Sequence, residues 1–215
     1  MKLKHITLLV TLAFAVNGAS AADKMVKPVL DAKMKAAVDK MIVDSFPAGE
    51  NQDLARLKQD ETIQTCNQYR DNVPEKLAAA IIERETKTIK YPADGKLMGD
   101  WKKGQKYYTM GFAYRIGSVE PDDPKKDRGG NCYACHAAEP KEVAYGTIGP
   151  GLTGYGKLRG SGDDIVKYTY DKIFNSQAFT ACSQMPRLGY HGILTPEKIA
   201  DITAFLISPE SPVNK

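Results

Sequence analysis

The middle of the chain carries a close group of residues that can bind a metal cofactor, Cys132-Tyr133-Ala134-Cys135-His136. Two thiols at this spacing, on a tight turn entering a helix, can each form a thioether with one vinyl group of a haem. The histidine that follows directly then lies under the iron and can ligate it. The motif therefore predicts one covalently bound haem c, attached to Cys132 and Cys135, with His136 as an iron ligand.

Two other kinds of site also use a C-x-x-C pair, a thioredoxin-like redox site and half of a zinc site. A zinc site needs further ligands, and the soft candidates that remain are His191 and the distant Cys66 and Cys182. A redox pair does not require His136, and residues 128–131, Arg-Gly-Gly-Asn, replace the strand expected before it. The haem interpretation is therefore favoured over both.

The sixth iron ligand is the next question, and Met185 is the first candidate. Met185-Pro186 lies 49 residues after His136, on an irregular stretch between two helical patterns. A thioether ligand favours Fe(II), so ligation by Met185 raises the reduction potential relative to two histidines. The alternatives are His191 as the ligand, or Met185 as an ordinary core methionine. With both axial positions filled, the iron has no open site for peroxide or oxygen, and electrons pass through the haem edge.

Two further cysteines, Cys66 and Cys182, are left over by the motif, and we expect them to form a disulfide because an oxidising compartment favours pairing. The loop between them, 182 minus 66 or 116 residues, would contribute about 4.7 kcal/mol in the chain-entropy model. Cys182 lies three residues before Met185, so the bridge would limit the motion of the loop that presents this ligand. A reactive thiol at the haem edge and an intermolecular link are the alternatives.

The start of the chain has the layout of a cleaved secretory signal. Lys2 and Lys4 precede the apolar run 6–16, and small residues follow as far as Ala22. The apolar run is too short to span a bilayer, so a membrane anchor is disfavoured, and we expect an exported, soluble, periplasmic protein once residues 1–22 are removed. Without the two lysines the formal charge falls from +4 to +2, which argues against a nucleic-acid binder.

Helical periodicity organises the chain before the haem motif. Apolar residues at spacings of three and four predict helices over 28–46, from about 54 towards 66, and from Pro74 onward. The break at residues 91–95, Tyr-Pro-Ala-Asp-Gly, predicts a domain boundary. We therefore expect a helical N-terminal extension over 23–90 and a second domain over 91–215.

The second domain should be helical as well. Helices are expected over 100–114 and 163–175, and a last helix has Thr195 as N-cap and stops at Pro209. The glycine-rich stretch 146–162 predicts little regular structure. Because no strand pattern is convincing, the expected fold class is all-α.

Residues 149–152, Gly-Pro-Gly-Leu, resemble the Gly-Pro-x-Leu segment of class I cytochromes c when they are taken together with C-x-x-C-H. In that family the proline carbonyl accepts the second ring N–H of the haem histidine. The resemblance implies that Pro150 orients His136 and raises its basicity. It also places Met185 where a class I cytochrome presents its distal methionine.

Longer stretches resemble SoxX, the small monohaem subunit of the SoxAX cytochrome complex of bacterial thiosulfate oxidation. They are Tyr-Pro-Ala-Asp-Gly-Lys-Leu-Met-Gly-Asp-Trp-Lys-Lys-Gly over 91–104, Gly-Asn before the haem motif, Gly-Thr-Ile-Gly-Pro-Gly-Leu over 146–152, Met185-Pro186, and Leu-Ile-Ser-Pro-Glu-Ser-Pro-Val-Asn over 206–214. The haem motifs are common to class I cytochromes, so the Pro-Ala-Asp-Gly and Ser-Pro-Val-Asn segments carry the narrower resemblance. It implies a class I cytochrome c domain in which Gly104 and Tyr108 pack against Phe205 of the last helix.

The resemblance also implies a role and partners. In that family the larger haem subunit couples thiosulfate to a cysteine of a carrier protein, as an L-cysteine S-thiosulfotransferase, and releases two electrons. The small subunit passes them one at a time to a soluble cytochrome c. This chain would then form a heterodimer with a SoxA-like subunit, would reach the sulfur carrier through the complex, and would hold no catalytic residue. The alternatives are a free-standing electron shuttle, which the long extension argues against, and a haem enzyme or gas sensor with an open iron site.

Overall fold

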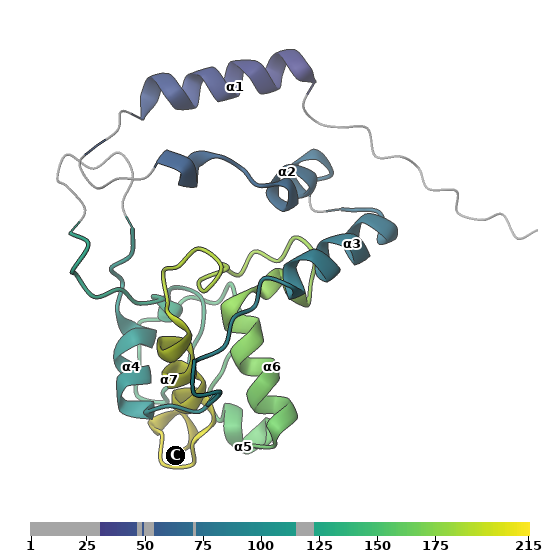
Figure 1. Cartoon of the computed structure of the whole chain (residues 1–215). Helices are drawn as coiled ribbons and strands as arrows, with labels where there is room; N and C mark the ends of the chain where they lie inside the picture. The colour runs from purple at the N-terminus through teal and green to yellow at the C-terminus, as the bar shows by residue number, and fades with distance from the viewer. Residues whose placement is uncertain (1–30, 47–48, 50–53, 71, 115–122) are drawn as a thin grey trace, which may run out of the picture.

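The computed structural model describes residues 31–46, 49, 54–70, 72–114 and 123–215, so the predicted signal over 1–22 lies outside the described residues. Every regular element in this part of the chain is a helix, and the all-α prediction is confirmed (Figure 1). The α-helices are α1 (Ala32–Ser45), α2 (Glu61–Gln68), α3 (Glu75–Thr86), α4 (Trp101–Thr109), α5 (Tyr155–Arg159), α6 (Asp163–Phe174) and α7 (Pro196–Ile207). The 3-10 turns are η1 (Leu54–Leu57), η2 (Cys132–Ala134), η3 (Ser176–Ala178) and η4 (Pro212–Asn214).

Helices α4 and α7 cross at close range and form the centre of the main hydrophobic core. A Cβ atom on Gly104 would lie 2.0 Å from the backbone oxygen of Asp201, so a side chain there would push the two helices apart. Tyr108, one turn later, is 1% exposed, and its ring centroid lies 5.1 Å from that of Phe205. The predicted packing of Gly104 and Tyr108 against Phe205 is confirmed.

Helix α7 supplies much of the hydrophobic core. It begins as the sequence predicts, with Thr195 accepting a hydrogen bond from the Lys198 N–H and Pro196 in the first turn. Its buried side chains pack with those of α6 and α4, and each large apolar side chain removed from water contributes about 1.5–3 kcal/mol. The largest fully buried apolar side chains of the α4–α7 region are Tyr108, Tyr170, Phe205, Leu194, Ile199, Ile202, Ile207 and Val213.

The C-terminal residues are hydrogen-bonded to the start of α5. The Asn214 side chain accepts hydrogen bonds from the N–H groups of Gly156 and Lys157, at 2.8 and 3.2 Å. Its amide group donates to the carbonyl oxygens of Leu206 and Ser208, both at 3.0 Å. The stretch 146–162, predicted to be irregular, therefore contains a short helix that a distant asparagine caps.

The N-terminal helices follow the predicted pattern with local differences. Every residue of α1 is exposed or half-exposed among the described residues, so its predicted apolar face lies uncovered there, with Met34 and Met41 50% and 59% exposed. The second predicted helix is divided into η1 and α2, because Asp60 caps α2 by accepting from the Ile63 N–H at 2.9 Å. Pro74 is the N-cap of α3 and not its first residue.

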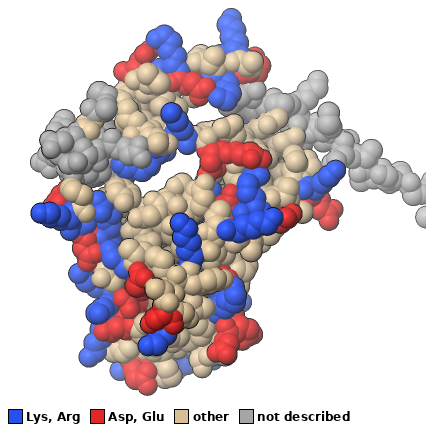
Figure 2. Space-filling model, in the orientation of Figure 1, with Lys and Arg blue, Asp and Glu red and all other residues tan. Residues whose placement is uncertain are grey.

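Helices α2 and α3 pack against the loop that contains Cys182 through a small cluster of buried side chains. Its buried members are Cys66, Ile81 and Cys182. Figure 2 shows that basic and acidic side chains are interspersed on the outer surface in this view. No described helix has the length and hydropathy that a bilayer span requires.

Candidate functional site

The C-x-x-C-H motif forms a tight turn that sets its three functional residues side by side. The backbone oxygen of Cys132 accepts hydrogen bonds from the N–H groups of Cys135 and His136, at 3.1 and 2.9 Å. Asn131 enters the turn with a left-handed φ of 48°. The sequence predicted that the turn would enter a helix. This is wrong, because η2 ends at Ala134 and bends and turns follow it.

His136 is oriented by the Pro150 carbonyl, as the resemblance implies. Its Nδ1 lies 2.7 Å from the Pro150 oxygen. A carbonyl has no proton to give, so Nδ1 carries the proton and the lone pair of Nε2 is available to a metal. A Cβ atom on Gly149 would lie 2.1 Å from His136 Cε1, so the imidazole ring needs a glycine at this position.

The stretch 146–152 lies beside residues 133–137 and is joined to them by backbone hydrogen bonds. The N–H of Gly149 donates to the Cys135 oxygen at 2.9 Å, and the N–H of Leu152 donates to the Ala137 oxygen at 2.7 Å. The Tyr108 hydroxyl, from the core, donates to the His136 oxygen at 3.3 Å. Backbone contacts therefore hold the histidine side of the site within one short part of the chain.

Cys132 and Cys135 are free thiols that are half-buried as residues. Burial, and then the neighbouring Cys135, raises the pKa of the Cys132 thiol to about 12. Reactive dithiol sites show the opposite shift, because their chemistry needs a thiolate. Cys132 borders Leu188 and Leu194, since all three side chains lie within 4 Å of the position that a Cβ on Gly130 would take. This apolar setting suits a buried thioether better than a redox pair.

Cys66 and Cys182 form the predicted disulfide, with a Cα–Cα distance of 5.4 Å across 116 residues. The bridge also removes the two cysteines that a zinc site would need. Within the described ranges, no three His, Cys, Asp or Glu side chains come together as a metal cluster.

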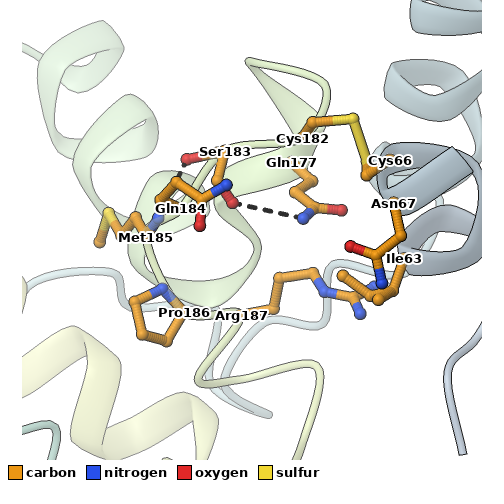
Figure 3. Close-up of a pocket in the computed structure, with 10 residues that line it drawn as sticks. All are labelled: Ile63, Cys66, Asn67, Gln177, Cys182, Ser183, Gln184, Met185, Pro186 and Arg187. Carbon is orange, nitrogen blue, oxygen red and sulfur yellow. Dashed lines mark hydrogen bonds between the residues drawn. A yellow bond between two sulfur atoms is a disulfide. The ribbon is translucent and has the colours of Figure 1, made fainter. Parts of the chain in front are cut away.

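Met185 lies on the loop between η3 and α7, and its backbone carbonyl and N–H groups are each hydrogen-bonded to a serine hydroxyl. Its carbonyl accepts from the Ser176 hydroxyl at 2.5 Å, and its N–H donates to the Ser183 hydroxyl at 3.3 Å. Figure 3 shows its side chain pointing away from the Cys66–Cys182 bridge. The half-buried side chain packs against the main hydrophobic cluster, as those of Cys132 and Leu152 also do.

His191, the alternative ligand, lies in a polar setting. Burial and the nearby Arg187 guanidinium lower the pKa of His191, while the carboxylates of Asp60 and Glu85 oppose this. The Tyr190 ring stands edge-on to the imidazole, with centroids 5.0 Å apart. His191 therefore lies beside charged groups that α2 and α3 contribute.

Arg187 is 3% exposed, and its burial was not predicted from the sequence. Its guanidinium binds Glu85 Oε2 at 3.1 Å and Asp60 Oδ2 at 2.5 Å. The sequence shows an arginine two residues after Met185. It does not show whether that arginine is buried or exposed, so it could not predict the ion cluster.

The residues fit a covalently bound haem c. Two free thiols are presented on one turn, and a histidine with a free Nε2 follows them, oriented by a carbonyl. A thioether side chain borders the same hydrophobic cluster. This donor set matches the attachment and ligation chemistry of the haem.

Comparison with known proteins finds similarity to a bacterial sequence relative and to a solved structure. A protein of Aquifex aeolicus (strain VF5) described as "Uncharacterized lipoprotein" is 45% identical over 158 residues, and the match covers 73% of each chain. The crystal structure of SoxXA from P. pantotrophus matches with 21% identity and a TM-score of 0.38, over 57% of this chain and 95% of that one. No family model matches the chain.

Proposed function

We propose that this chain, which belongs to the same family as the Aquifex aeolicus lipoprotein, is an exported monohaem c-type cytochrome that transfers electrons. The observation that carries the proposal is the 2.7 Å contact of His136 Nδ1 with the Pro150 oxygen, directly beside two free thiols. This contact leaves the lone pair of Nε2 for iron and fixes the orientation of the imidazole ring.

Four residues hold the haem in this proposal. Cys132 and Cys135 would form the thioethers, and His136 and Met185 would ligate the iron. When bound, the haem supplies a one-electron Fe(III)/Fe(II) couple. The Pro150 carbonyl keeps the proton on Nδ1 of His136, and the surrounding apolar side chains exclude water from the thioether attached to Cys132.

The choice of Met185 over His191 follows from what surrounds each side chain. Met185 packs against the same hydrophobic cluster as Cys132. His191 is instead an exposed residue outside that cluster, and the charges of Arg187, Asp60 and Glu85 act on its pKa. Ligation by Met185 would leave the iron without an open position, so electrons would enter and leave through the haem edge.

Export to the periplasm is supported by two observations. The signal-like layout of residues 1–22 is one. The other is the relative's description as a lipoprotein, a class of exported proteins. The disulfide agrees with both, because such bonds persist in oxidising compartments.

The narrower proposal is that the chain is the SoxX-like subunit of a thiosulfate-oxidising complex. It rests on the resemblance over residues 91–104 and 206–214. In this role the chain pairs with a larger SoxA-like haem subunit, takes electrons released when thiosulfate is coupled to a carrier-protein cysteine, and passes them to a soluble cytochrome c. Thiosulfotransferase catalysis would belong to the partner.

Two experiments test these proposals. In a host that attaches c-type haem, the reduced protein should show the sharp visible bands of a haem c, and Cys132→Ala/Cys135→Ala should lose them. A wild-type protein without these bands would overturn the first proposal. For the narrower one, affinity purification from the native organism should recover a second haem polypeptide, and recovery of this chain alone would count against the heterodimer.

A further inference from the structure

The loop that carries Met185 is attached to the N-terminal helices by a buried ion cluster. Arg187 is 3% exposed and lies between the carboxylate of Glu85, on α3, and that of Asp60, the N-cap of α2. Asp60 precedes Arg187 by 127 residues in the chain, and Glu85 precedes it by 102 residues. They therefore join elements that the sequence does not connect locally.

A second arginine and several neutral groups surround the cluster, and Arg84 Nε lies 3.8 Å from Glu85 Oε1. Glu85, itself 3% exposed, accepts from the Asn175 amide at 2.7 Å and from the Thr62 hydroxyl. The Asn175 amide also donates to Thr88 Oγ1 at 2.9 Å. A buried ion pair that loses one partner leaves an uncompensated charge, so such a cluster resists displacement of its members.

Two attachments flank Met185 on its loop. Cys182, three residues before it, is bonded to Cys66 of α2, and Arg187, two residues after it, is bonded to Asp60 and Glu85. Between them lies a pocket of about 290 Å³, lined by α2 on one side and by residues 182–187 on the other (Figure 3). The disulfide and the Arg187 side chain bridge this pocket.

We propose that Arg187 is a positioning residue that keeps Met185 on the iron, acting as the ionic half of a clamp by which α2 and α3 hold the loop. The inference rests on the proposed haem ligation. When the ionic half is released, the loop can move into the adjoining pocket, and the fraction of protein with an open sixth position rises. The affinity for an added ligand scales with that fraction.

The experiment compares holo-protein variants by visible spectroscopy and imidazole titration. Arg187→Lys keeps a positive charge but cannot bind two carboxylates in the same fork geometry. Arg187→Met removes the charge altogether. If the Arg187→Met protein does not fold, the Arg187→Lys protein still provides the test. In both, the long-wavelength ferric band of Met-ligated haem should weaken, while imidazole binds about tenfold more tightly because the open fraction has risen.

The matched control is Lys167→Met on α6. Lys167 pairs with Asp171, whose side chain is 6% exposed, so this change also leaves a buried carboxylate without its cation. It should lower the thermal midpoint and leave the ferric band and imidazole affinity unchanged. A merely structural role for Arg187 would give the same result as this control.

The outcomes separate the inference from the proposed function. If wild type shows the Met band and both Arg187 variants keep it with wild-type imidazole affinity, the positioning role is overturned and the haem proposal stands. If the wild-type haem protein lacks the band, ligation by Met185 and the inference fail together. A weakened band and tighter imidazole binding in the Arg187 variants alone would support the clamp.

Discussion

The two sides of the proposed haem site are held by different kinds of contact. On the histidine side, backbone hydrogen bonds and close glycine contacts join residues 132–137 to 146–152, within one short part of the chain. On the methionine side, a disulfide across 116 residues and the ion pairs of Arg187 hold the loop. In the proposed site, haem attachment would therefore be a local property of residues 132–152, whereas ligation by Met185 would depend on the contacts of its loop with α2 and α3.

The largest expected effect is that of removing the disulfide. Cys66→Ser/Cys182→Ser should lower the free energy of unfolding by up to about 4.7 kcal/mol, because the unfolded chain regains its loop entropy. Chemical denaturation of the holo-protein measures this loss. Haem attachment should be unchanged, since it depends on the histidine side. A variant without covalent haem would break the separation between the two sides.

Met185→Ala tests the methionine side directly. It should leave haem attached and lower the reduction potential by a part of the ~0.8 V range that axial ligands control, because a thioether favours Fe(II). Potentiometric titration checks this. An unchanged potential would transfer the ligand role elsewhere, and His191→Ala would then be the variant to measure.

Gly149→Ala tests the histidine side. The added Cβ would lie 2.1 Å from His136 Cε1, and such overpacking costs about 1–3 kcal/mol. The ring should be displaced from the Pro150 carbonyl, with a lower yield of haem-bearing protein and a shifted Soret band. Gly151→Ala is the matched control, because a Cβ there has no atom within 4 Å among the described residues. Equal yields from the two variants would contradict the close contact.

Acid should weaken the methionine side through Asp60. The Ile63 N–H and the Arg187 guanidinium hold the pKa of Asp60 below its usual range, although burial opposes them. A carboxylate with a lowered folded pKa stabilises the fold above its unfolded pKa, and this contribution is lost as pH falls through the folded value. Stability of wild type should therefore fall more steeply with acid than that of Asp60→Asn, as unfolding curves from neutral pH downward will measure. Parallel pH profiles would show that Asp60 adds nothing to this dependence.

The same contrast explains how much could be predicted from the sequence. The last helix, with Thr195 and Pro196 at its start, was predictable because its signals are local. The disulfide could also be predicted, since the motif left two cysteines over. Helix α5 and the Arg187 cluster could not, because their partners, Asn214, Asp60 and Glu85, are distant in the chain.

Local signals also failed where tertiary contacts decide the outcome. No helix follows Cys135, because the chain after the turn is bonded to the stretch 146–152 instead. Periodicity predicted one helix where the Asp60 cap separates η1 from α2. Capping and long-range bonding outweigh periodicity at both places.

The most direct test of the central claim is the intact mass of the mature protein, purified from the periplasm of a host that attaches c-type haem. The account predicts a red protein, heavier than its polypeptide by one haem, with the added mass retained on denaturation. A colourless protein with the mass of the polypeptide alone would contradict it.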